Sequence, residues 1–151
     1  MKKSLIFIVF IVILGVLSYA IFSYTTLPPR KGFVLAQLSI TTLALEVADT
    51  KRLQTKGLSK REKLLEGEGM LFVFQENQYH GFWMKDMRFS IDILWFDENY
   101  RLVDVQEAVP PESYPKVFHP HIPARYVVEL PAHFISKYNI ELGDVLQIPK
   151  K

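Results

Sequence analysis

The chain has 151 residues, a formal net charge of +2 and no cysteine. Disulfides and a cysteine nucleophile are therefore excluded, and a stable core has to come from packing of the plentiful apolar residues. The first 31 residues hold four of the 18 basic residues and no acid, so the remainder carries a net charge of −2. It has no basic stripe, which argues against nucleic acid as a partner.

The most informative segment is an uncharged, mostly apolar run at residues 4–29, which lies between two pairs of basic residues. About 20 apolar residues are enough for a helix to cross a bilayer core, so residues 1–24 are predicted to form a signal anchor, a transmembrane helix. The basic start favours a single-pass topology with the C-terminal domain outside the cytoplasm. The alternative is a cleaved signal peptide and secretion after cleavage near Ala20; the length of the run favours the anchor. Residues 25–37 are then a linker, and residues 38–151 one extracytoplasmic β domain.

The folded part is predicted to begin with a strand and a short helix. In Thr42–Val47 the larger apolar residues alternate with smaller or polar ones, as in a half-buried strand. Asp49 or Thr50 can cap a helix that runs through Thr55, and Gly57 suits its C-terminal end. A second helical turn is predicted at residues 60–65, before a glycine turn.

Strands dominate the rest of the chain. Short apolar runs bounded by turn residues predict strands at Gly69–Phe74, Gly81–Met87, Ile91–Phe96, Arg101–Ala108, Arg125–Leu130 and Val145–Ile148. The turn at residues 97–100 makes 91–108 a hairpin, and residues 109–123, with five of the nine prolines, an extended loop. Pro131 can open a helix that ends near Tyr138. This pattern predicts a mainly β (α+β) fold, a compact β-barrel or sandwich with one or two short helices, preceded by the transmembrane helix.

Several motifs carry a resemblance to a known family. They are Gly57-Leu58, Gly69-Met70-Leu71-Phe72-Val73-Phe74, Phe82-Trp83-Met84-Lys85, Ile91-Asp92-Ile93-Leu94, Tyr126-Val127-Val128-Glu129-Leu130 and Gly143-Asp144. At this spacing the chain resembles the bacterial and archaeal family called domain of unknown function 192 (DUF192), over roughly residues 43–148. The resemblance implies a small, mostly β domain, often behind a signal peptide or anchor, and no established activity. The chain differs from the usual pattern at Asp86-Met87, where Asn-Thr is usual, and at Ser90, where proline is usual.

The best candidate for a ligand-binding site is Trp83, Lys85, Asp86 and Asp92. Side chains alternate between the faces of a strand, so Trp83 and Lys85 would share one face, while Met84 and Asp86 would share the other. The indole could stack on a ligand while the ammonium group holds an anionic group. The simpler alternative is structural: Trp83 lies in the core, Lys85 pairs with Asp92 or another acid, and the partner of Asp92 is Lys85 or a backbone amide.

Carboxylates are the candidate catalytic groups. Asp86, Asp92 and Glu129 could provide a pair for acid–base chemistry, although Asp92 interrupts an apolar strand and is expected to be buried with a partner. His119 and His121 could place two imidazoles on one face of the loop, but zinc needs at least a third protein ligand. No metal site and no cofactor are therefore predicted.

The sequence favours a membrane-tethered extracytoplasmic β domain that binds a cell-envelope polymer, a peptide or a membrane-protein partner. The alternative is an envelope hydrolase that uses Asp92 with Asp86 or Glu129. A purely structural partner of another membrane protein is a third reading. The chain has no nucleophile elbow and no phosphate-binding glycine loop, so the residues leave open whether it is an enzyme.

Overall fold

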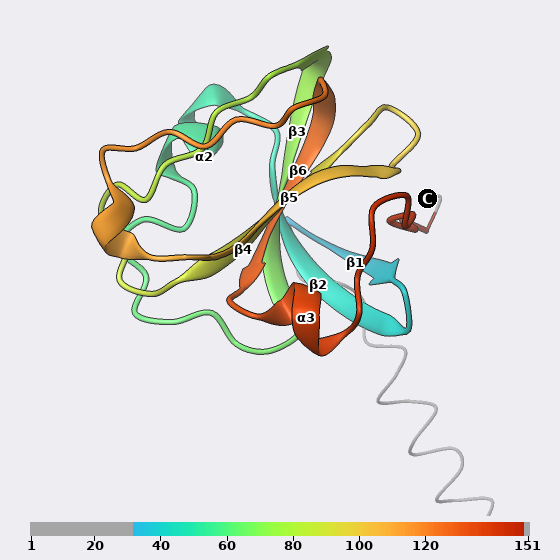
Figure 1. Ribbon diagram of the computed structural model, residues 1–151, viewed down its shortest axis with the longest axis horizontal. Helices are drawn as coiled ribbons and strands as arrows, with labels where there is room; N and C mark the ends of the chain where they lie inside the picture. The colour runs from blue at the N-terminus through green and yellow to red at the C-terminus, as the bar shows by residue number, and fades with distance from the viewer. Residues whose placement is uncertain (1–31, 150–151) are drawn as a thin grey trace, which may run out of the picture.

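Residues 32–149 are described by the computed structural model, and they form one six-stranded sheet with two short α-helices (Figure 1). The elements in chain order are β1 (Phe33–Leu38), β2 (Thr41–Ala48), α2 (Lys51–Lys56), β3 (Glu68–Gln78), β4 (Ile91–Phe96), β5 (Leu102–Val109), a 3-10 turn (Pro111–Ser113), β6 (Ala124–Pro131) and α3 (Phe134–Lys137). The strand order is β1-β2-β3-β6-β4-β5, with β2 and β3 parallel and the other neighbours antiparallel. The prediction of a mainly β domain with two short helices is confirmed.

The predicted barrel or sandwich is wrong, because this single sheet does not close on itself. Within residues 32–149, the C-terminal stretch links its two edges, β1 and β5. Gln147 exchanges two backbone hydrogen bonds of 2.8 Å with Gln37 of β1, and the N–H of Leu146 donates to the carbonyl of Tyr100, just before β5 (2.9 Å). The predicted strand Val145–Ile148 is therefore two isolated bridges. Because the stretch bonds alternately to both edges, it builds no continuous ladder with either.

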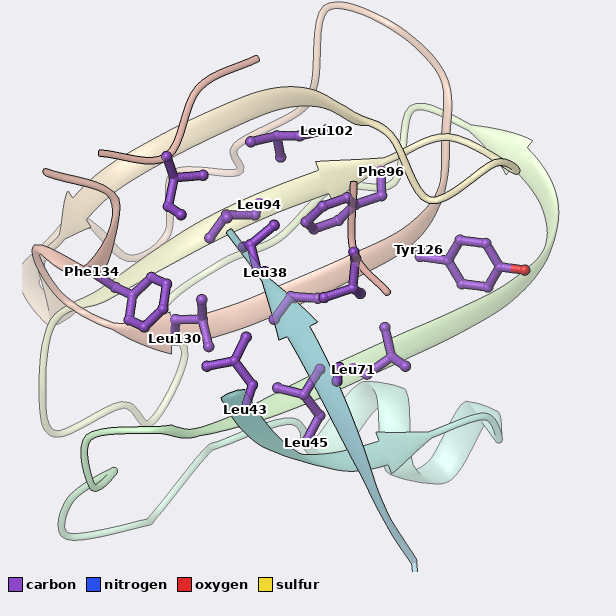
Figure 2. Packing of buried hydrophobic residues seen from close by; sticks show 14 of the residues in the cluster. Leu38, Leu43, Leu45, Leu71, Leu94, Phe96, Leu102, Tyr126, Leu130 and Phe134 are labelled. Atoms are coloured by element: carbon purple, nitrogen blue, oxygen red, sulfur yellow. The ribbon is translucent and has the colours of Figure 1, made fainter. Parts of the chain in front are cut away.

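Both faces of the sheet are buried, and each has its own apolar core. On one face, α3 and the C-terminal stretch cover a cluster into which Leu43, Leu94 and Leu130 point (Figure 2). On the other face, α2 and the long loops cover a cluster that includes Phe72 and Trp95. All six residues of β4 are buried for this reason, since a strand covered on both sides reads as a continuous apolar run. An acid in β4 or β6 is therefore buried whichever face of the sheet its side chain lies on.

The folded domain begins earlier than predicted. β1 starts at Phe33, inside the predicted linker, and its side chains alternate so that Ala36 and Leu38 are buried while Gln37 is exposed. The predicted first helix is confirmed as α2, because Thr50 caps it by accepting a hydrogen bond from the N–H of Leu53 (3.4 Å). The predicted helical turn at residues 60–65 does not form.

The predicted strand Gly81–Met87 is also wrong. Within it only Phe82 pairs with another segment, through two backbone hydrogen bonds to Phe118 of 2.9 and 2.8 Å. Beyond Met84 the chain turns, and Asp86 takes a left-handed conformation with φ 57°. A single paired residue holds this loop against the loop before β6, so it forms no ladder.

The predicted transmembrane helix, residues 1–24, lies outside the described residues. Between residues 32 and 149, no helix is long and apolar enough to cross a membrane.

Candidate functional site

A pocket of about 290 Å³ opens on the α2 side of the sheet. Its walls come from α2 and the turn after it, from β3, from the loop after β3 and from one residue of β6. Its lining includes Lys51, Lys56, Gly57, Phe72, His80, Phe82, Trp83 and Glu129. The sequence motif around Trp83 and the acid of β6 therefore meet in one place, although they lie more than 40 residues apart in the chain.

Glu129 is the unusual group in this pocket. Its side chain is 5% exposed, and its Oε2 atom is buried without a hydrogen-bond partner in the described part of the chain. In the sheet it lies between Met70 and Ile93, on the face that packs around Phe72. Burial in these apolar surroundings raises the pKa of Glu129 to about 8, with the positive charge of Arg61 opposing the shift. At neutral pH the group is mostly an uncharged carboxylic acid, which can donate one hydrogen bond and accept others.

Arg61 does not neutralise Glu129, because it is paired elsewhere. Its Nη2 atom lies 2.5 Å from Oε2 of Glu46. Glu46 is opposite Met70 in the β2–β3 pair, and Met70 is opposite Glu129 in the β3–β6 pair. The two acids thus follow one row across the same face of the sheet, and the one guanidinium group pairs with the outer acid.

Gly57 lies close to the buried acid. It ends α2 with φ 49°, a conformation that side chains other than glycine rarely adopt. A Cβ atom at this position would lie 3.6 Å from the ring of Phe72 and 3.9 Å from Oε2 of Glu129. The end of the helix therefore passes close to the carboxyl group without a side chain to cover it.

Trp83 lies at the rim of the pocket and is 48% exposed, so the structural alternative that places it in the core is wrong. Its ring meets that of Tyr114 edge to face, with centroids 6.2 Å apart. The neighbouring Phe82 is buried and packs edge to face on Phe72 at 4.8 Å. Because Phe82 is anchored between the sheet and Phe118, its neighbour is turned outward. An exposed indole beside a pocket is suited to stacking on a ligand.

Lys85 and Asp86 line a second, adjoining pocket of about 390 Å³. This pocket shares Trp83 and Lys56 with the first and adds Lys60 to its wall. Lys85 and Asp86 are both exposed, and their backbone carbonyls hold the loop by accepting hydrogen bonds from Ser59 Oγ (2.9 Å) and from the N–H of Lys60 (2.8 Å). Lysines thus surround Trp83 on the side of the second pocket.

Asp92 belongs to neither pocket. It is fully buried on the opposite face of the sheet, where its carboxylate accepts backbone hydrogen bonds from Ala108 (2.8 Å), His133 (3.0 Å) and Ile135 (2.9 Å). These amides belong to the irregular end of β5 and to the start of α3. Of the two partners expected for Asp92, Lys85 or a backbone amide, the structure shows backbone amides, so the alternative with Lys85 is wrong. Since Asp92 and Glu129 face opposite sides of the sheet, they do not converge on one cleft.

The histidines contribute one residue that the sequence did not point to. His80 lines the pocket, stacks on Phe74 with centroids 3.6 Å apart, and burial lowers its pKa below the ordinary 6.5, so the ring is mostly neutral at pH 7. His119 bonds to the carbonyl of Tyr79 (3.0 Å), and His121 pairs with Asp104 (2.8 Å). Over residues 32–149, no group of three or more potential ligands could hold a metal ion.

The fold and the pocket define a small domain built on a single β-sheet, with no activity evident from its motifs. The chain belongs to the DUF192 family, described as an uncharacterized ACR, whose model matches residues 34–148. The resemblance seen in the sequence is thereby confirmed. The UPF0127 protein PH1112 of Pyrococcus horikoshii is 34% identical over 68 residues, or 45% of this chain and 53% of that protein. The match therefore spans about half the length of this curated relative.

Two solved structures share the fold. One, from Sinorhizobium meliloti and named a "putative transcription regulator", has a TM-score of 0.73 and 25% identity over 77% of this chain and 93% of that one. The other, a protein of unknown function from Novosphingobium aromaticivorans, has a TM-score of 0.72 and 23% identity over 76% and 84%. The family and its fold are thus established for the folded domain.

Proposed function

We propose that this protein is a binding module and that its ligand enters the pocket between Glu129 and Trp83. The observation that carries the proposal is the buried, unpartnered Oε2 atom of Glu129 in the pocket. Buried polar groups in folded proteins almost always have hydrogen-bond partners, and an unpaired one is costly. A ligand that bonds to Glu129 would remove this cost, and the free energy would appear as affinity.

The rim of the pocket indicates the rest of the ligand. Trp83 offers an exposed aromatic face, and Lys56, Lys60 and Lys85 lie on the side of the adjoining pocket. A ligand with a ring that stacks on the indole and an anionic group that reaches the lysines fits both features. Asp86 is the acid in this lysine-rich wall.

The setting that we propose is the cell envelope. The uncharged run at residues 4–29 would anchor the chain in the membrane, with the β domain outside the cytoplasm. An envelope polymer, an envelope peptide or a segment of another membrane protein would then be within reach of the tethered pocket.

Tryptophan fluorescence tests the proposal, because the chain has two tryptophans in different environments. Trp83 is half-exposed, whereas Trp95 is fully buried and donates a hydrogen bond to the carbonyl of His80 (3.0 Å). Full-length protein in detergent would be titrated with envelope oligosaccharides and peptides. A saturable change that disappears in Trp83→Phe is expected for the ligand. A panel that leaves the fluorescence of Trp83 unchanged, or a ligand whose affinity is the same in Trp83→Ala, would contradict the proposal.

Hydrolysis of an envelope substrate is the second candidate. The raised pKa of Glu129, about 8, suits a general acid that must stay protonated at neutral pH. Glycosidases usually need two carboxyl groups about 5–10 Å apart, and Glu129 is the one carboxyl residue among those that line its pocket. Asp86 lines the adjoining pocket. Release of product from an envelope polysaccharide that is abolished by Glu129→Gln would favour this candidate over binding alone.

A further inference from the structure

We propose that Glu129 recognises a neutral, amide-like group of the ligand, one that presents a hydrogen-bond acceptor beside a donor. This inference rests on the proposed function and adds the chemical class of the group that reaches the floor of the pocket.

The chemistry of the acid supports a neutral partner. The buried carboxylic acid has an O–H that donates and a C=O that accepts, side by side in one plane. An amide has the complementary pair, an N–H that donates and a C=O that accepts. Oε2 is buried and has no hydrogen bond within the described part of the protein, and the nearby end of α2 is a glycine, whose added Cβ atom would lie 3.9 Å from Oε2. The side chain of Glu129 lines the pocket, and a planar amide that reached its carboxyl group could pair with both oxygen atoms.

The charges around the acid argue against a cationic group at the floor of the pocket. Lys51 and Lys56 of α2 line the pocket, and Arg61 acts on Glu129 from the turn beyond the helix, although Glu46 neutralises Arg61. His80, from the loop after β3, is mostly neutral at pH 7. A cationic ligand would have to pass the lysines.

An anion would have to leave water and sit against apolar side chains. The floor beside the acid is formed by the rings of Phe72 and Phe82, which pack edge to face at 4.8 Å. Desolvating a carboxylate there is unfavourable without an ion pair. The lysines at the mouth are better placed to hold the anionic part of the ligand outside the floor.

Three probes of the same shape and different charge test the inference: benzamide, benzamidinium and benzoate. Each would be titrated into full-length protein in detergent and followed by ligand-observed NMR, with protein-free micelles as the blank. At pH 6.5 we expect benzamide to bind at least about tenfold more tightly than either charged probe. This ratio corresponds to the net contribution of about one hydrogen bond between neutral groups. Above pH 8, where the acid loses its proton, the affinity of benzamidinium should rise relative to that of benzamide.

Two variants assign the effect to Glu129. Glu129→Gln keeps a donor beside an acceptor, so it should retain benzamide binding within about threefold and lose the change with pH. Glu129→Leu should lose benzamide binding. The exposed Glu141, in the turn before the C-terminal stretch, gives the matched control Glu141→Gln, which should behave as the unmodified protein.

Tighter binding of benzamidinium or benzoate at pH 6.5, or benzamide binding that survives Glu129→Leu, would overturn the inference. Failure of all three probes to bind would overturn it as well. The proposed function is decided separately by the Trp83 titrations, because a ligand found there with no amide-like preference would leave the pocket as the site and remove only this assignment.

Discussion

Replacing Glu129 by glutamine should change how the stability of the protein depends on pH. Glutamine keeps the shape of the protonated acid and never ionises, so the difference between the two proteins isolates the titration of one group. In the folded state burial raises the pKa of Glu129 to about 8, against an ordinary value of 4.5 in an unfolded chain. The folded state therefore holds a proton that the unfolded state releases between these two pH values.

The sign and size follow from this difference. The stability associated with the proton is fully present below about pH 4.5 and is lost as the pH rises to about 8. Each pH unit in this window lowers the free energy of unfolding by about 1.4 kcal/mol, so the full loss at pH 8 is about 5 kcal/mol. Glu129→Gln has no group that titrates here, so it does not show this loss. Its free energy of unfolding should equal that of the unmodified protein near pH 4.5, exceed it by a growing amount up to pH 8, and exceed it by a constant amount above pH 8.

Urea unfolding followed by circular dichroism, at half-unit steps from pH 4.5 to pH 9, would measure the effect. Glu141→Gln serves again as the control for an exposed acid and should stay parallel to the unmodified protein. Curves for Glu129→Gln that stay within about 0.5 kcal/mol of the unmodified protein across the range would refute the reasoning. They would mean that the pKa of Glu129 is the same in the folded and unfolded protein, so that the carboxyl group is ionised at neutral pH in both.

Three further outcomes are expected. Asp92→Asn should destabilise the domain by about 2–4 kcal/mol in urea unfolding, because the new NH₂ group would face a backbone N–H in a site built from three donors; a variant that unfolds like the unmodified protein would show that Asp92 is not structural. The full-length protein should stay with membranes after a high-salt wash, and recovery of a soluble form that begins near Ile21 would instead indicate cleavage. Replacing His119 and His121 together by alanine should leave stability and binding unchanged; stoichiometric zinc that survives dialysis in the parent and is lost in the double variant would contradict this.

The sequence was sufficient to predict local features of the fold. Thr50, one of the two predicted cap residues, and Gly57 mark the ends of α2. These features depend on neighbours within a few residues. β1 was missed because the pattern of Phe33–Leu38 is short, and its pairing with β2 is what makes it a strand.

The two buried acids show where sequence reasoning stops. Asp92 and Glu129 both interrupt apolar strands, and the sequence favoured Asp92, not Glu129, as a ligand-binding residue. The difference arises from the pairing of β4 with β6, which turns Asp92 toward the amides near α3 and Glu129 toward the pocket. That pairing joins segments about 35 residues apart in the chain, so no local signal records it. The same holds for His80, which reaches the pocket only because β3 and α2 pack together.

A crystallographic fragment screen of the protein would test most directly whether the Glu129 pocket is a ligand site. We expect fragments to collect between Gly57, Phe82 and Trp83, with a polar atom within hydrogen-bonding distance of Oε2 of Glu129. Fragments that avoid this pocket, together with an Oε2 atom bonded to Arg61 or to another group of the protein, would contradict the proposal.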